Sequence, residues 1–114
     1  MSVTVGDMIE RLGLHAAAGA EDVDAAVSGA QVCDLLSHVM AQGRAGQVWI
    51  TIQTHANIIA VAALAKLAAV IVAGGFAPEE ETVMRAEEEG VPLLLSGEKA
   101  YTLAGQLWEM GVRD

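Results

Sequence analysis

The stretch from Val48 to Ile59 constrains the fold more than any other part of the chain. It begins with residues of high strand propensity, which run as far as Ile52, and turns abruptly polar at Gln53. A nearly apolar segment of helical length follows from Ala56. A buried strand that stops at polar residues on a helix N-terminus is where open α/β sheets place ligand sites. This stretch therefore predicts a strand, a polar rim at its end, and a helix that is covered on more than one side.

Strand and helix patterns alternate along the rest of the chain. This alternation predicts right-handed crossovers and a mostly parallel sheet with helices on both faces. A chain of 114 residues is long enough for one core. We therefore expect one α/β domain over residues 1–114, with a sheet of four to five strands and a short N-terminal helix. The expected strands cover residues 14–18, 27–33, 47–53 (at the centre of the sheet), 69–73 and 91–95, and the expected helices end near residues 12, 42, 67, 89 and 110.

Several helix ends carry local signals. Thr4, followed three residues later by Asp7, predicts a capping box at the first helix. Asp34 is predicted to cap the next helix, and Gly43 to end it in the left-handed conformation. Pro78 is predicted as the first residue of a helix whose positive dipole end is complemented by Glu79, Glu80 and Glu81.

Charge and composition exclude several classes of protein. The formal charge is −9, and the six basic residues are scattered, which argues against a nucleic-acid partner. No apolar run reaches the roughly 20 residues that cross a membrane, and the N-terminus lacks a signal-peptide pattern. The single cysteine, Cys33, fits a reducing compartment, so we expect a cytoplasmic protein. No carboxylate lies between Asp34 and Glu79, so the centre offers no acid–base pair and we expect no enzyme activity.

Polar residues and glycines follow the ends of the expected parallel strands. Because parallel strands end at the same edge of a sheet, we expect these residues to gather there. The functional interpretation is a small pocket that offers amide, imidazole and helix N–H groups to an anionic or nucleotide-like ligand. The alternative is that the same residues only cap helices and satisfy the backbone, with Thr54 as the cap of the helix that follows. The predicted ligand-binding residues are Asp34, Gln53, Thr54, His55, Asn57, Gly74, Gly75 and Ser96.

Three other chemistries fit this edge less well. The glycine pair would let a phosphate approach, but the GxGxxG and GxxxxGK[ST] fingerprints are absent and a tight strand exit explains both glycines. Cys33 beside His55 would form a thiolate–imidazole nucleophile, although a lone cysteine at a strand end is usually a small core residue. Asp34, His38 and His55 would offer three zinc ligands, without the spacing of a metal motif. We predict no catalytic residue, no metal and no cofactor.

The helix expected from Ala56 to Leu67 is apolar nearly all the way round. After it packs on the sheet, one apolar side is left to cover, and a second copy covers it most simply. We therefore expect a homodimer through this helix or a surface nearby. Trp49 and Trp108 are expected to fill the core or that interface, and the glutamates between residues 79 and 89 to form a solvated face.

Three segments of the chain resemble a stand-alone DRTGG domain. They read DLLSHVM at residues 34–40, WITIQTHANIIAVA at residues 49–62 and EEEGVPLLL at residues 87–95. The resemblance covers essentially the whole chain. The segment that names the family reads DAAVSGA here, at residues 24–30. It keeps Asp24 and Gly29 but lacks the arginine, the threonine and the second glycine, so no role of that arginine carries over to this chain.

The resemblance also carries functional implications. Similar domains accompany HPr kinase-like, phosphotransacetylase-like and CBS-containing proteins. The resemblance therefore implies a non-catalytic regulatory or sensor role, a homodimer, and a small nucleotide-like ligand or a protein partner such as a kinase or a redox enzyme. The alternative is an accessory fragment of a phosphotransferase or acyltransferase-type enzyme.

Overall fold

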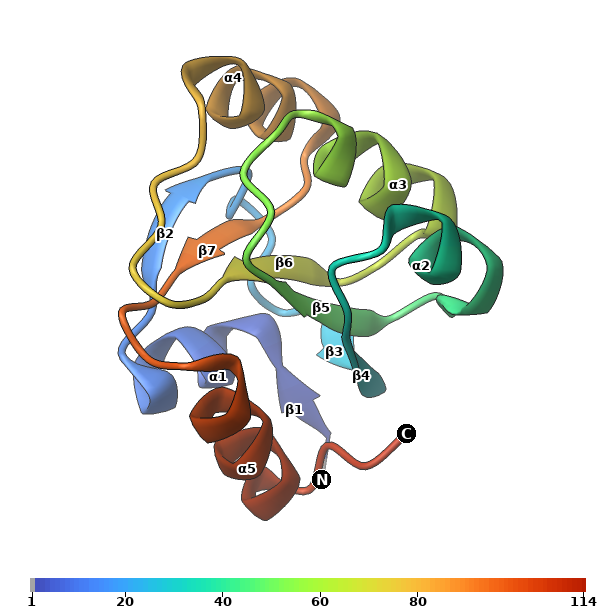
Figure 1. The fold of residues 1–114 in the computed structure, drawn as a ribbon. Helices are drawn as coiled ribbons and strands as arrows, with labels where there is room; N and C mark the ends of the chain where they lie inside the picture. The colour runs from blue at the N-terminus through green and yellow to red at the C-terminus, as the bar shows by residue number, and fades with distance from the viewer. Residues whose placement is uncertain (1) are drawn as a thin grey trace.

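The computed structural model describes residues 2–114 and is built around a five-stranded sheet in the order β2-β7-β6-β5-β4. Strands β4 to β7 run parallel, and β2 pairs antiparallel with β7 (Figure 1). A separate two-stranded antiparallel ladder joins β1 to β3. The predicted fold class is confirmed. The strands are β1 Val3–Thr4, β2 His15–Ala18, β3 Ala26–Val27, β4 Gly29–Val32, β5 Gln47–Thr51, β6 Ala69–Val72 and β7 Leu93–Leu95.

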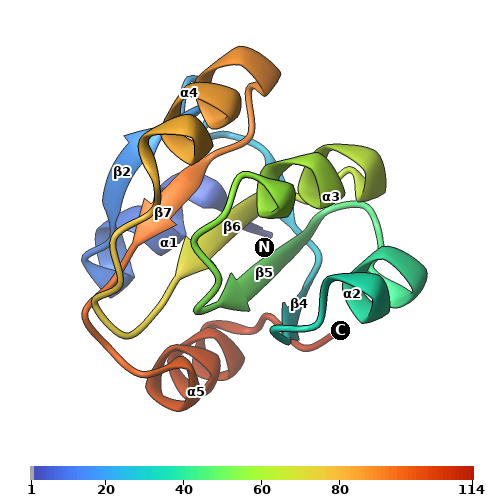
Figure 2. The ribbon, with the colours of Figure 1, turned by 45° about the horizontal axis from the view of Figure 1, so that its top comes forward.

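Helices cover both faces of the sheet. The helices are divided between the two faces, with α2 Leu36–Gln42, α3 Asn57–Ala65 and α4 Glu80–Glu89 on one side and α1 Val5–Leu12 and α5 Ala100–Met110 on the other (Figures 1 and 2). Within residues 2–114, no helix combines the length and the apolar character that a membrane crossing requires.

Successive side chains of the inner strands pack alternately into two separate hydrophobic cores. Val48 and Ile50 of β5 pack with α1 and α5, whereas Trp49 between them packs with α2 and α3. This follows from the alternation of side chains along a strand. Every residue of β5 and β6 is buried, as expected for parallel strands with helices on both faces.

The position predicted for residues 47–53 is wrong in two respects. The middle strand of the sheet is β6, because β2 adds a further strand beyond β7. In addition, β5 ends at Thr51, since the Asp34 carboxylate accepts the next backbone N–H, that of Ile52, at 2.9 Å. β5 therefore ends where the Asp34 side chain, and not the backbone of β4, accepts the next hydrogen bond of the ladder.

The strand predicted over residues 27–33 is split at Ser28. The Ser28 N–H donates to the Gly46 carbonyl, so β3 turns away to pair with β1, and β4 alone joins the sheet. The C-terminus then returns along β4, where the Ala30 N–H donates to the Asp114 carbonyl at 2.7 Å. A Cβ at Gly29 would overlap that carbonyl, which is a physical reason for glycine at this position of the DRTGG-like segment.

The predicted helix ends are partly right. Thr4 and Asp7 form the capping box, and the helices α1, α4 and α5 end at left-handed glycines. Asp34, however, is not a cap: α2 has Leu35 at its N-cap, without a side-chain hydrogen bond. Gly43 is extended, with φ −64°, so the predicted left-handed exit is wrong there. Pro78 also lies outside its helix, because α4 begins at Glu80 after an extended Glu79.

One glutamate near the end of α4 has a structural role. The Glu87 carboxylate accepts the Gly19 N–H at 2.8 Å, just beyond the end of β2. The glutamates predicted to form a solvated face, Glu79 to Glu81 and Glu87 to Glu89, are all exposed, and Glu87 in addition joins α4 to the edge strand.

Candidate functional site

The four parallel strands end at one edge of the sheet, and the predicted site residues lie in the loops that follow them. They do not form one cluster. Asp34 and Gln53 lie beyond β4 and β5, Thr54 to Asn57 lie in the loop that leads to α3, and the glycine pair and Ser96 lie beyond β6 and β7.

At the β4–β5 end, Asp34 and Gln53 are tied to each other and to the strands. Asp34 Oδ1 accepts from Thr51 Oγ1 at 2.8 Å and from the Ile52 N–H at 2.9 Å. Gln53 Nε2 donates to the Asp34 carbonyl at 3.0 Å. Among residues 2–114, Asp34 Oδ2 and Gln53 Oε1 accept no hydrogen bond, and both are acceptors. This end therefore repels a phosphate and suits a hydrogen-bond donor.

Cys33 is also engaged at this end. Its carbonyl accepts from Trp49 Nε1 at 2.7 Å, and its thiol sulfur accepts the Leu35 N–H at 3.4 Å. These bonds agree with a structural cysteine that helps to seat a fully buried tryptophan. Within residues 2–114, no three His, Cys, Asp or Glu side chains lie close enough to hold a metal ion.

The loop between β5 and α3 is fastened to α4. The Thr54 carbonyl accepts from Thr82 Oγ1 at 2.6 Å and from the Glu79 N–H at 3.2 Å. Thr54 is not the predicted cap, because the N-cap of α3 is Ala56, which makes no side-chain bond. The local side-chain acceptor is His55, whose Nδ1 accepts the Asn57 N–H at 3.0 Å. The capping interpretation therefore describes His55 better than Thr54.

The glycine pair forms a strand exit whose amides are already used. Gly74 and Gly75 have φ of +78° and +79°, a conformation that favours glycine. The Gly74 N–H donates to the Glu98 carbonyl at 2.8 Å, and the Gly75 N–H to the Ser96 carbonyl at 2.9 Å. These two amides join the loop after β6 to the loop after β7, so they are not free to bind a phosphate.

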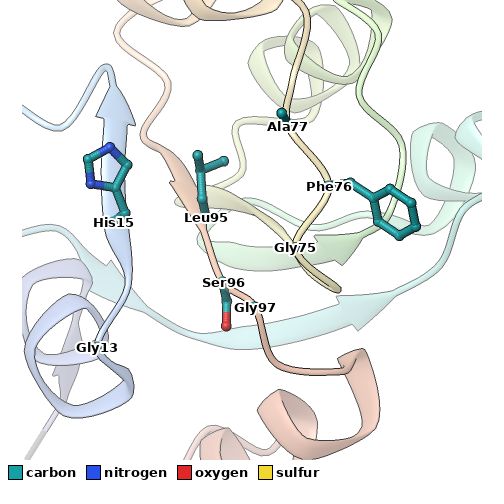
Figure 3. Close-up of a pocket in the computed structure, with 8 residues that line it drawn as sticks. All are labelled: Gly13, His15, Gly75, Phe76, Ala77, Leu95, Ser96 and Gly97. Carbon is teal, nitrogen blue, oxygen red and sulfur yellow. The ribbon is translucent and has the colours of Figure 1, made fainter.

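An open cavity of about 340 Å³ lies at the β6–β7 end of the edge (Figure 3). His15 borders it from β2, Ser96 from the end of β7, and Phe76 from the loop after β6, with the Phe76 ring turned away from His15 (Figure 3). The Phe76 ring packs over Gly74, where a Cβ would lie 3.1 Å from it, and the side chain is 52% exposed. The lining residues are Gly13, His15, Gly75, Phe76, Ala77, Leu95, Ser96 and Gly97.

Gly75 and Ser96 are among the site residues predicted from the sequence, whereas His15 and Phe76 are not. His15 borders the cavity only because β2 pairs antiparallel with β7, which places His15 opposite Leu95. Nothing local to a short alanine-rich strand specifies that pairing. A signal for Phe76 did exist, since a large apolar residue directly after a glycine strand exit is poorly placed for the core.

Two helices that begin at this edge differ in charge. α4 and α5 start after Glu79 and Lys99, and neither N-cap makes a side-chain hydrogen bond. The first turn of α4 contains Glu80 and Glu81, whereas the first turn of α5 contains no acidic residue. The start of α5, four residues beyond Ser96, is therefore the more favourable place for negative charge.

The architecture defines a parallel-sheet α/β domain with its loops gathered at one edge. Comparison with protein-family models is more specific, because the model described as the DRTGG domain matches residues 7–110. The chain belongs to the DRTGG domain family. The resemblance that the sequence suggested is confirmed.

Among solved structures, the chain is similar to the CBS and DRTGG domains of the regulatory region of Clostridium perfringens pyrophosphatase, a structure complexed with the activator diadenosine tetraphosphate. The TM-score is 0.72 at 17% sequence identity, over 90% of this chain and 44% of that chain. The chain thus spans less than half of that protein's resolved region, and the similarity shows a shared fold. A search of curated proteins finds no match.

Proposed function

We propose that this chain is a non-catalytic regulatory domain that binds a small anionic, nucleotide-like ligand. The observation that carries the proposal is the shared fold with a regulatory region whose structure holds a dinucleotide activator. The cavity beside β2 and β7 supports it, because it opens at the sheet edge where α/β folds place ligands.

The residues around this cavity suit the two parts of a nucleotide. Beside the cavity, on the side of Gly74 and the exposed Ile52, the half-exposed Phe76 ring offers an apolar face to a base. Ser96 Oγ accepts the Glu98 N–H at 3.0 Å, which leaves the hydroxyl proton for a ligand. Lys99 and the uncapped start of α5 favour the phosphate. We therefore place the ligand at the β6–β7 end and not at the β4–β5 end.

Catalysis is not proposed. Within the described part of the chain, the cavity lining holds one ionisable side chain, His15, and no second acid or base, nucleophile pair or metal ligand set converges with it there. Among residues 2–114, no feature favours the alternative of a phosphotransferase or acyltransferase fragment.

Thermal unfolding with a panel of diadenosine tetraphosphate, ATP, AMP, inorganic triphosphate and acetyl phosphate tests the binding proposal. A ligand at about a hundred times its Kd adds about 2.7 kcal/mol to the free energy of unfolding, which raises Tm by several degrees. Binding without consumption of the ligand supports a regulatory domain. If no member of the panel raises Tm, the ligand proposal fails and a protein-docking role is favoured.

Matched variants locate the ligand. Phe76→Ala and Ser96→Ala should reduce the Tm shift, while Gln53→Ala and Asn57→Ala, at the other end of the edge, should leave it unchanged. The opposite result would place the ligand among the residues that the sequence first suggested.

We also propose that the protein acts as a homodimer in a reducing, cytoplasmic compartment, as the family resemblance and Cys33 suggest. On α3, the surface first expected to form the dimer, Ile58, Ile59, Val61 and Ala62 are buried within one chain and Leu64 is 71% exposed. Light scattering after gel filtration tests the dimer, and a monomer at all concentrations would exclude it. A protein partner such as a kinase or a redox enzyme stays a prediction that co-purification tests.

A further inference from the structure

The aromatic residues of this chain are few, and most of them are exposed. The sequence contains two tryptophans, one tyrosine and one phenylalanine. Trp49 is fully buried, but Tyr101 is 88% exposed and Trp108 is 56% exposed, and both lie on α5. They are seven residues apart, which places them two turns apart on one face of the helix. Tryptophan and tyrosine are the residues that most often anchor protein interfaces.

Next to Tyr101 the outer surface of α5 is hollow, although Trp108 does not line this hollow. Ala104 and Gly105 lie between the two aromatic residues, and a Cβ at Gly105 would meet no heavy atom within 4 Å. An open groove of about 510 Å³ runs along this part of α5, from Tyr101 to Glu109. Small residues in the middle of a helix face let another helix approach closely, and the flanking aromatic rings can then pack over the gap.

The outer face of α5 differs in charge from α4, on the opposite side of the molecule. α4 exposes Glu80, Glu81, Glu88 and Glu89, so two copies would repel each other there. The ends of α5 carry charges of both signs instead, with Glu98 and Lys99 before the helix and Glu109, Arg113 and Asp114 at or after its end. Arg113 lies over the Trp108 ring, 4.9 Å from its centroid, and its Nε donates to the Trp108 carbonyl.

We propose that the outer face of α5 is the surface through which two copies of this chain associate. The two α5 helices cross antiparallel about a twofold axis over Ala104 and Gly105, with Tyr101 of each copy packed against Trp108 of the other. This arrangement brings the N-terminal end of one helix to the C-terminal end of the other. Glu98 then meets Arg113 of the second copy, and Lys99 meets its Glu109. The inference rests on the proposed homodimer and assigns it to α5 in place of α3.

Gel filtration with light scattering, over a range of protein concentrations, tests this surface. The unmodified protein should have twice the chain mass. Tyr101→Ser combined with Trp108→Ser should raise the dimer dissociation constant at least about tenfold. Leu64→Ser removes an equally exposed apolar side chain from α3 and should leave the dimer intact.

Gly105→Leu shows whether a change in mass reflects the interface or the fold. Leucine favours the helix and its Cβ meets no neighbour within the chain, so the protein should keep its helix content and unfold in one cooperative transition while the dimer is lost. A protein that is monomeric without any substitution overturns both the surface and the homodimer. A dimer that survives the α5 changes but is lost in Leu64→Ser overturns the surface alone. Ligand-induced Tm shifts, measured on the same variants, report on the regulatory proposal separately.

Discussion

The β4–β5 end and the β6–β7 end of the sheet edge are built in opposite ways. At the first end, Asp34 and Gln53 form hydrogen bonds with other residues of the chain and hold the strand ends together. At the second end, Gly74 and Gly75 turn the chain sharply, and an open cavity remains beside Ser96. Most of the residues that look functional in the sequence thus belong to the closed end.

This difference shows what polar residues at a strand end do. A side chain that bonds to the backbone is held in place by that bond, and only its remaining acceptors, here Asp34 Oδ2 and Gln53 Oε1, stay available to a ligand. The cavity lies instead where the loops after β6 and β7, joined through the Gly74 and Gly75 amides, meet a further wall from the edge strand β2. If this contrast is right, substitutions at the closed end should change stability, and substitutions at the open end should change binding.

The largest effect is expected from Asp34→Ala. It leaves the hydroxyl of Thr51, which is 1% exposed, and the Ile52 N–H without their acceptor, so the free energy of unfolding should fall by about 2–3 kcal/mol. Urea unfolding measures this change. Asp34→Asn keeps an oxygen acceptor and should lose about half as much. Asp24→Ala removes an exposed loop aspartate and serves as the control. If both substitutions lower the free energy of unfolding equally, Asp34 does not hold the β4–β5 end together.

A smaller effect is expected from Gly75→Ala at the open end. The added Cβ meets nothing nearer than the Gly97 Cα at 4.0 Å, so the cost comes from the φ of +79° and should be about 1–2 kcal/mol. Gly97 lines the same cavity but does not have a left-handed φ, and a Cβ at this position meets no atom within 4 Å. Gly97→Ala should therefore leave the stability unchanged. Thermal unfolding of the pair checks this, and similar Tm values would mean that the turn is not strained.

The smallest effect is expected from His55→Ala. It removes the acceptor of the Asn57 N–H at the start of α3, at a cost of about 0.5–1 kcal/mol. His38→Ala, at an exposed position within α2, should be neutral or slightly stabilising, because alanine has the highest helix propensity. If His55→Ala also abolishes a ligand-induced Tm shift, His55 belongs to the binding site and the contrast between the two ends has to be redrawn.

The sequence predicted those features whose two partners lie close together in the chain. Thr4 and Asp7 cap each other across three residues, so their capping box could be identified before the structure. Asp34 looks like a helix cap by the same rule, but its carboxylate binds Thr51, which only the pairing of β4 with β5 brings near. Helix caps are local, and strand-to-strand contacts are not.

The glycines show the same limit. Gly43 follows a helix, which predicts a left-handed exit, yet its φ is −64°. Glycine is needed there for another reason, because a Cβ would lie 2.5 Å from the Val39 carbonyl. Likewise, the alternation of strands and helices predicted the sheet, but it could not place β2 beside β7 or His15 beside the cavity.

The pairing of β2 with β7 also bears on how the molecule folds. It joins a strand near the start of the chain to the last strand, so β2 has no partner in the sheet until nearly all of the chain is present. Contacts between distant parts of a chain close slowly, because the loop between them must first lose entropy. We expect α1 and β2 to dock late in refolding, after β4 to β7 have assembled. The wall of the cavity that contains His15 would then be the last part of the site to form.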